Sequence, residues 1–431
     1  MHSMSMLQTL RHAHYRRLWA GQAFTGIAMG MQTLAIGWMA VVIASEEGRP
    51  ELGAFYLGLL GLARGLPATF SGLIGGVVVD WFDRRLVLWT VRALMTVNAV
   101  VLAVLSLSGR VNIATLMAVT VVLGICMSLG APTQQVMLSR LVPSSALLSA
   151  VSLNQVTMQT SWLVGPLVAG VLIIPVGSGG VMVASAACLL VALGFLLGLP
   201  PSPPERGTDE PRSMAAAAGS LLEGFRFIAA EPASRWLLIT STVAALTVRP
   251  VQQMLPAFVH DVLGAGAAEL SWLLAAQSIG SIGGTAFAAS IGNVRQRGLA
   301  ISAAIVAWGA MTVAFAGQHA LVPAVALIFL VGFPNWAFAS TMVVHLQTQT
   351  PDRLRGRVMS LQHLTQGGIA QFGAMLVGTL GALLGVDVAI AIVGGAFAAF
   401  GIILFLRVGA IRELGGGARH GPVEVRTRDP L

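Results

Sequence analysis

Residues 141–204 read LVPSSALLSAVSLNQVTMQTSWLVGPLVAGVLIIPVGSGGVMVASAACLLVALGFLLGLPPSPP, and this stretch decides the fold. Its 64 residues include no Asp, Glu, Lys or Arg. Crossing the hydrocarbon core of a bilayer takes about 20 apolar residues, so the stretch is long enough for two helices. The segment from Pro175 to Gly180 carries turn-forming residues near its middle. We therefore predict two membrane-spanning helices joined by a tight turn.

The remainder of the chain has the same apolar character. Hydrophobic residues make up 56% and charged residues 10% of the chain, and the mean hydropathy is +0.81. Backbone groups in lipid must bond within their own segment, so the expected spans are α-helices. We predict an all-α polytopic membrane protein with twelve transmembrane helices. The candidate spans are 18–44, 52–80, 86–108, 112–139, 146–174, 180–200, 234–260, 268–292, 297–317, 320–349, 357–384 and 386–407.

The basic residues, all 25 of which are Arg, predict the orientation in the membrane. If the N-terminus is cytoplasmic, 21 of them lie in cytoplasmic segments or at cytoplasmic helix ends. Arg49 and Arg110 fall in outer loops, and Arg64 and Arg249 fall inside spans. This asymmetry follows the positive-inside rule and predicts that both termini are cytoplasmic. It also accounts for the pI of 11.2 without a nucleic-acid partner.

Two halves are expected, separated by a polar linker that begins Pro-Pro-Ser-Pro-Pro and continues as a short surface helix. With a shift of 208 residues, Gly165 falls on Gly373 and Gly170 falls on Gly378. The shift preserves helix direction, as in a parallel repeat of six helices plus six. The expected parts are an N-terminal bundle (1–200), the linker (201–233), a C-terminal bundle (234–407) and a disordered cytoplasmic tail (408–431).

A first motif lies between the second and third expected spans and reads GVVVDWFDRR from Gly76 to Arg85. It resembles the cytoplasmic loop signature of the major facilitator superfamily. The resemblance implies that Asp80, Arg84 and Arg85 latch the cytoplasmic side shut in one state of the transporter. The alternative is that Arg84 and Arg85 only set the topology.

A second motif, PDRLRGRVMS, starts at Pro351 before the eleventh span. It is similar to a segment of the enterobactin-exporter and macrolide-efflux branch of the superfamily, as are residues 10–19 and 221–227. The resemblance implies a proton-coupled exporter in a bacterial inner membrane. We expect Asp352 to cap the eleventh helix, and Arg355 and Arg357 to meet lipid headgroups or the latch. Pro166 follows Gly165, as in exporters of this type, and is expected to bend the fifth span during gating.

Arg64 and Arg249 are the most informative interior residues. Each lies about 10 residues from the outer end of its span, which is roughly 15 Å deep. An Arg in hydrocarbon costs about 2.5–3.5 kcal/mol even on insertion scales, so it normally faces a cavity or a partner. No Asp or Glu occupies the middle of a span. We predict that both arginines bind an anionic substrate; the alternative is that they bond helix-end carbonyls or reach outer-loop acids.

Neutral polar residues provide further candidates for lining a substrate cavity, although amides in spans often bond helix to helix instead. These candidates are Gln22, Gln32, Gln134, Asn154, Gln277 and Asn335. His345 and His363 lie near cytoplasmic helix ends and are candidates for a proton relay, or structural residues. Cys126 and Cys188 fall inside spans, so neither a disulfide nor a metal site is expected.

We expect a secondary transporter rather than an enzyme, without a cofactor, that lies in the membrane as a monomer. Its expected partners are membrane lipids and a small molecule, either a siderophore-like, anionic or amphipathic compound or an antibiotic. Two alternatives remain open. One is a lipid or lysolipid flippase of the same fold, and the other is a membrane sensor or scaffold that transports nothing.

Overall fold

The computed structural model describes residues 6–203, 214–290 and 297–408. Within these ranges, the side chains of residues 6–8, 68–81, 214–218, 220–221, 289–290, 297–300 and 352 lie outside the description. The prediction of disorder for the tail concerns residues that, apart from Val408, also lie outside the described ranges.

Twelve helical spans are present in the described residues, which confirms the predicted fold class. The N-terminal bundle contains α1 (Ala13–Glu46), α2 (Leu52–Trp81), α3 (Arg84–Leu107), α4 (Ile113–Leu141) and α5 (Ser144–Leu197), the last supplying two spans. The C-terminal bundle contains α7 (Pro232–Leu246) with α8 (Val251–Ala257) and η2 (Phe258–Val262), α9 (Ala267–Ser290), α10 (Arg297–Ala316), α11 (Leu321–Gln349), α12 (Asp352–His363) with η3 (Leu364–Ile369) and α13 (Ala370–Leu384), and α14 (Val386–Arg407). Seven continuous helices of the described chain have the length and hydropathy of a membrane span.

The continuous assignment of α5 contains the predicted turn. A straight helix of 54 residues would be about 80 Å long, far more than a bilayer. Gly177 has φ 66° and ψ −178°, which reverses the chain two residues after Pro175. A positive φ of this size strains a residue with a Cβ, so glycine is favoured at this turn.

The seventh span is interrupted, and the eleventh contains a π-helical segment. In the seventh span, the helix stops after Leu246 and restarts at Val251, and Arg249 lies in the break. Pro250 contributes to this break because its nitrogen has no proton to donate to the preceding turn. In the eleventh span, the π-helix η3 connects α12 to α13. That span also begins at Asp352, before the predicted start at 357.

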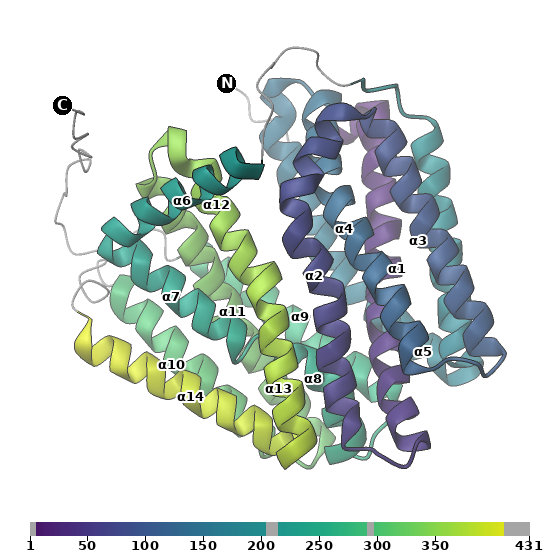
Figure 1. Cartoon of the computed structure of the whole chain (residues 1–431), viewed down its shortest axis with the longest axis vertical. Coiled ribbons are helices and arrows are strands. Elements are labelled where there is room, and N and C mark those ends of the chain that lie inside the picture. The colour runs from purple at the N-terminus through teal and green to yellow at the C-terminus, as the bar shows by residue number, and fades with distance from the viewer. Residues whose placement is uncertain (1–5, 204–213, 291–296, 409–431) are drawn as a thin grey trace.

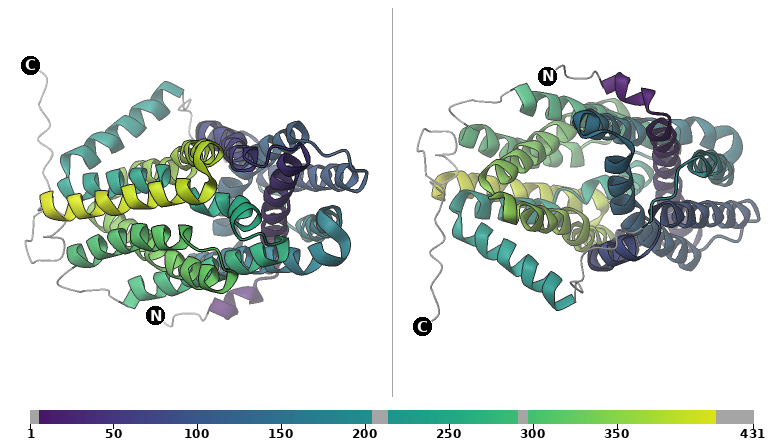
Figure 2. Two further views of the ribbon diagram at one scale, coloured as in Figure 1. Left: turned by 90° about the horizontal axis from the view of Figure 1, so that it is seen from below. Right: turned by 90° about the horizontal axis from the view of Figure 1, so that it is seen from above.

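The two bundles lie side by side (Figures 1 and 2). We call the end that carries the first residues of α1 and the linker helix α6 (Met214–Ala230) the terminal face, and the other end the opposite face. The opposite face carries the turns between α1 and α2 and between α3 and α4, and Gly385. In Figure 1 the bundles approach each other near the opposite face, where α2 meets α13, and diverge toward the terminal face.

Close contacts near the opposite face hold the bundles together. A methyl group added at Gly58 of α2 would lie 2.7 Å from the carbonyl oxygen of Ala374 on α13. Gly378 packs its backbone against Ala54 and Gly58, and Gly170 of α5 packs against Ser271 of α9. Gly170 and Gly378 are related by the 208-residue shift. The sequence repeat therefore corresponds to two equivalent contacts between the bundles.

The linker helix α6 packs on the C-terminal bundle at the terminal face. Glu223 of α6 pairs with Arg357 and lies 3.9 Å from Arg353, both on α12. Gly224 lies against the backbone of Arg357. The predicted surface helix is thus attached to the half of the protein that follows it in the chain.

Candidate functional site

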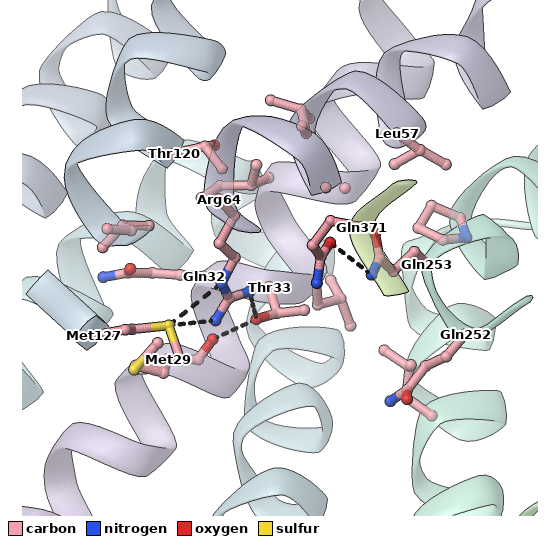
Figure 3. Close-up of a pocket in the computed structure, with 18 of the residues that line it drawn as sticks. Met29, Gln32, Thr33, Leu57, Arg64, Thr120, Met127, Gln252, Gln253 and Gln371 are labelled. Carbon is pink, nitrogen blue, oxygen red and sulfur yellow. Dashed lines mark hydrogen bonds between the residues drawn. The ribbon is translucent and has the colours of Figure 1, made fainter. Parts of the chain in front are cut away.

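A cavity of about 330 Å³ lies between the two bundles, near the middle of the helices (Figure 3). Its wall comes from α1, α2, α4 and α5 of one bundle and from α8, α9 and α13 of the other. The lining residues are Met29, Gln32, Thr33, Leu34, Ile36, Gly37, Leu57, Leu60, Gly61, Arg64, Thr120, Leu123, Met127, Trp162, Gln252, Gln253, Pro256, Leu274 and Gln371. This is the size and mostly apolar character of a small-molecule site.

Arg64 is the charged residue of the cavity wall. Its Nε and Nη2 lie 3.3 and 3.1 Å from the Met127 sulfur, and its Nη1 lies 3.5 Å from Thr33 Oγ1 (Figure 3). A thioether sulfur and a hydroxyl at 3.5 Å are weak acceptors for a guanidinium ion. No Asp or Glu is among the residues that line the cavity. Arg64 therefore brings a positive charge without an acidic partner among the described lining residues to a cavity in the membrane interior.

The packing of α2 against α4 places this guanidinium beside Met127. Gly124 lies directly against the backbone carbonyl of Arg64, where any side chain would collide. Met127 follows three residues later, almost one helical turn along α4. The close approach at Gly124 thus brings the Met127 sulfur within reach of the Arg64 side chain.

Amide side chains from both bundles also line the cavity. Gln32 donates from Nε2 to Ser185 Oγ at 2.8 Å, while its buried Oε1 has no hydrogen-bond partner within the described part of the chain. A buried acceptor without a partner is costly, so this oxygen is suited to a donor on a ligand. In the other bundle, Gln253 Nε2 donates to Gln371 Oε1 at 3.2 Å. The wall therefore offers a cation, hydrogen-bonding amides and a large apolar surface.

The predicted binding residues separate into three groups. Arg64 and Gln32 line the cavity. Gln22, Gln134 and Asn154 gather elsewhere in the N-terminal bundle, as described below. Arg249, Gln277 and Asn335 lie in the C-terminal bundle and are not part of the cavity lining.

Arg249 and Gln277 nevertheless have buried polar atoms without a hydrogen-bond partner among the described residues. Arg249 Nε and Nη2 are buried with no hydrogen-bond partner in the described residues, and the same is true of Gln277 Oε1. Conversely, the sequence prediction did not include Gln252, Gln253 and Gln371 among the cavity residues. All three are amides in apolar spans, and this pattern could have identified them. The pattern alone does not show which face of the helix a residue occupies, so it cannot place the residue in the cavity.

A second cluster surrounds Arg92 of α3. Its Nη2 donates to Gln22 Oε1 at 2.8 Å and to Gln134 Oε1 at 3.1 Å. Gln134 Nε2 in turn donates to Asn154 Oδ1, a longer contact of 3.4 Å. From its position in the sequence, Arg92 was expected at a cytoplasmic helix end, but the residue is only 8% exposed and lies within the bundle. Its neighbours come from α1, α4 and α5, far apart in the sequence.

The predicted latch residues lie at the terminal face, in two groups. Arg84 donates to the Pro203 carbonyl at 2.8 Å, after the sixth span, and Arg85 donates to the carbonyl of Leu197, the last residue of that span, at 2.9 Å. Arg355 Nε donates to the Gln347 carbonyl at 3.1 Å, and Arg357 pairs with Glu223.

The remaining members of the latch set lie elsewhere. The side chains of Asp80 and Asp352 are outside the described residues. Pro166 lies inside α5 and packs against Gly30 of α1, within one bundle. Within the described residues, no pair that bridges the bundles at the terminal face is therefore established, and the latch stays a prediction.

Of the two predicted relay histidines, His345 is near an acid. Its Nε2 lies 3.8 Å from Glu231 Oε2. Burial by itself would raise the pKa of Glu231, but the nearby side chains of His345 and Ser234 and the hydrogen bonds from the backbone N–H groups of Ser234 and Ala233 outweigh it and lower the pKa to about 2. Glu231 thereby caps the N-terminus of α7 as an anion. His363 is exposed near the end of α12.

Replacing Glu231 by Gln is expected to lower the stability of the protein at pH 7 by about 1 kcal/mol, because the charged cap is lost. The pKa of Glu231 in the folded protein lies below its ordinary value of 4.5, so the stabilisation is present above that pH and is lost as the pH falls toward 2. Thermal unfolding of both proteins in detergent, between pH 7 and pH 2.5, measures this difference. A constant difference across that range would contradict the assignment; Glu51→Gln, at an exposed position, is the control.

The sequence comparisons agree with this architecture. The profile of the transmembrane secretion effector family matches residues 4–415. The enterobactin exporter EntS of Shigella flexneri is 24% identical over 431 residues, which is 99% of this chain and 98% of that protein. The multidrug efflux pump Tap of Mycolicibacterium fortuitum is 27% identical over 370 residues, which is 82% of this chain and 86% of that protein.

Solved structures with the same fold are transporters. The nucleoside transporter NupG has a TM-score of 0.71 at 14% identity and covers 91% of this chain and 98% of its own. A bacterial homologue of the lysosomal transporter Spinster, solved in an inward-facing and unoccupied conformation, has a TM-score of 0.64 at 14% identity, with coverage of 92% and 97%. The chain is a multi-pass membrane transporter and belongs to the transmembrane secretion effector family of the major facilitator superfamily.

Proposed function

We propose that this protein exports an anionic, amphipathic small molecule by alternating access. The observation that carries the proposal is Arg64, a cation whose described partners are a sulfur and a hydroxyl and which lines a cavity between the bundles. A sulfonate, carboxylate or phenolate would accept forked hydrogen bonds from its guanidinium. The apolar remainder of the wall, including Leu57, Leu123 and Trp162, suits a ring system or an alkyl chain.

The relatives support the direction of transport and the class of cargo. One is named as an exporter of enterobactin and another as a multidrug efflux pump. A siderophore-like compound or an antibiotic is therefore the cargo that we propose. A lipid is the alternative cargo. The test below distinguishes an anionic cargo from a neutral lipid, because the binding affinity of a neutral lipid would depend little on Arg64.

The test is a binding comparison between 2-naphthalenesulfonate and 2-naphthalenesulfonamide. The two have the same ring system and differ by one negative charge. A cysteine placed at Met29, on the cavity wall, reports occupancy through protection from a thiol reagent, with Cys126 and Cys188 replaced by Ala. We expect the sulfonate to protect this position at a concentration at least tenfold lower than the sulfonamide. Equal protection by the two compounds would contradict an anion site.

We further propose that the terminal face is cytoplasmic and that the protein lies in a bacterial inner membrane as a monomer. The distribution of arginines supports this orientation. With the bundles in contact near the opposite face, the state described is then the one in which cargo enters from the cytoplasm. Alternating access would open the opposite face by breaking the contacts at Gly58 and Gly170.

Thiol labelling tests the orientation. Single cysteines at Arg212 and Arg353 are expected to react with an impermeant reagent only after the cells are opened. A cysteine at Arg49 is expected to react in intact cells, since this residue lies in a turn at the opposite face. Labelling of position 212 in intact cells, with position 49 protected, would reverse the proposed topology.

Proton antiport is the driving force that we propose, in keeping with the family resemblance. Glu231 stays ionised at neutral pH and therefore cannot take up and release the proton itself. His345, which lies beside it, is the candidate for carrying the proton. His345→Gln is then expected to abolish the response of transport to a pH gradient while leaving cargo binding unchanged.

A further inference from the structure

We propose that Arg92, with Gln22, Gln134 and Asn154, forms a second anion-binding site between the central cavity and the terminal face. This inference rests on the proposed function, since it concerns the same anionic cargo on its way to Arg64. The four residues come from four helices, and hydrogen bonds of 2.8 to 3.4 Å connect them.

The position of the cluster follows from the helix periodicity. Met29 and Thr33 of α1 line the cavity, and Gln22 precedes them by seven and eleven residues. These spacings are close to two and three turns of about 3.6 residues, so Gln22 lies on the same face of α1. On α4, Gln134 follows Met127 and Leu123 by the same seven and eleven residues. Both cavity-facing stripes therefore continue through the cluster toward the terminal face.

The distance between the Arg92 cluster and the central cavity can be measured along α1. Ten residues separate Gln22 from Gln32, which corresponds to about 15 Å of helix. An anion entering from the terminal face would thus meet Arg92 about 15 Å before the level of the central cavity. A charge in the membrane interior is costly without a partner. A cation at each end of this path would pair with the anion at both levels and so lower the cost of its passage.

The charge of Arg92 is not neutralised by its described contacts. The acceptors of its hydrogen bonds are neutral amide oxygens, and both bonds leave from Nη2. A buried guanidinium with amide partners alone retains a strong attraction for an anion. The bonds from Nη2 also fix the plane of the group, which presents Nε and Nη1 in a defined direction.

The experiment uses the full-length protein with Cys126 and Cys188 replaced by Ala and a reporter at Ala131→Cys. Ala131 is exposed and lies on α4 between Met127 and Gln134. Labelling rates from the terminal side are measured with a methanethiosulfonate carrying a sulfonate and with one carrying a trimethylammonium group. Their ratio is expressed relative to the same ratio for β-mercaptoethanol in solution, which corrects for intrinsic reactivity.

We expect this corrected ratio to favour the anionic reagent about tenfold or more, and Arg92→Gln to remove the preference. Arg92→Lys, which keeps the charge, should retain it. A corrected ratio near one, or a preference unchanged by Arg92→Gln, would overturn the proposal. If Arg92→Gln does not fold, the ratio in the parent protein and in Arg92→Lys still decides.

Ligand protection separates this site from the central one. We expect 2-naphthalenesulfonate, but not the sulfonamide, to protect both Ala131→Cys and the cysteine at Met29. Protection at Met29 alone would overturn the second site and leave the proposed function intact. Protection at Ala131 alone would support the second site and contradict the role of Arg64.

Discussion

Arg64→Gln is expected to weaken the binding of 2-naphthalenesulfonate by roughly 10- to 150-fold, because a charge-assisted contact contributes about 1.5–3 kcal/mol. Binding of the neutral sulfonamide is expected to change by less than about twofold. Arg64→Lys should lose part of the affinity, since a single ammonium cannot reproduce the planar fork. Isothermal titration of the purified variants measures these affinities.

Two variants serve as controls for this result. Arg249→Gln removes a second intramembrane cation that is not part of the cavity lining, and Arg49→Gln removes an exposed one. Both are expected to bind the sulfonate as the parent protein does. Equal losses for the sulfonate and the sulfonamide in Arg64→Gln, with reduced protein yield, would show that Arg64 holds the fold instead.

Gly58→Ala is expected to shift the protein away from the conformation described here. The added methyl would lie 2.7 Å from the Ala374 carbonyl oxygen and 3.1 Å from the Met375 Cα, both backbone atoms of the other bundle. Overpacking of this kind costs about 1–3 kcal/mol, and alternating access opens this contact in the other state. The population ratio should therefore change by roughly 5- to 150-fold.

A cysteine at Ile36, on the cavity wall, measures this shift through its reactivity from the opposite face. We expect the reactivity to rise in Gly58→Ala. Gly53→Ala on the same helix is the matched control, because its methyl would meet Val41 of its own bundle at an ordinary 3.5 Å. Equal reactivity in the two variants would mean that the contact at Gly58 does not govern access.

Much of the fold was predictable because lipid imposes simple constraints on sequence. The uncharged residues 141–204 predicted two spans, and the turn at Gly177 lies where Pro175 and the glycines indicated. The 208-residue repeat predicted equivalence between Gly170 and Gly378, and both lie at contacts between the bundles. The break in the seventh span and the π-helical segment of the eleventh were not predicted, because the apolar pattern of a span is the same whether its helix is regular or not.

The candidate site was only partly predictable. The depth of Arg64 and the lack of acids in span centres were visible in the sequence, and they led to a residue that lines the cavity. Arg249 had the same depth and the same signal, but it lies in the break of the seventh span and not in the cavity lining. Depth along a helix can be counted from the sequence, whereas the rotation of the helix and its neighbours depends on packing.

The depth of Arg92 could also be counted from the sequence, whereas its neighbours could not be predicted. Eight residues separate it from Arg84, the first residue of α3, so its distance from the helix end was known. Its contacts with Gln22 and Gln134 depend on three helices meeting in one bundle. The pattern that could have identified it was the shared depth of these polar residues, each about 7 to 10 residues from a terminal-face end.

We expect cargo to move through the Arg64 cavity from the terminal face to the opposite face. The most direct measurement is uptake of enterobactin and of 2-naphthalenesulfonate into sealed vesicles that carry the terminal face outside, with an acidic interior. We predict uptake that requires the protein and that falls at least tenfold in Arg64→Gln. Uptake no faster than in vesicles without protein, or equal uptake by Arg64→Gln, would contradict the account.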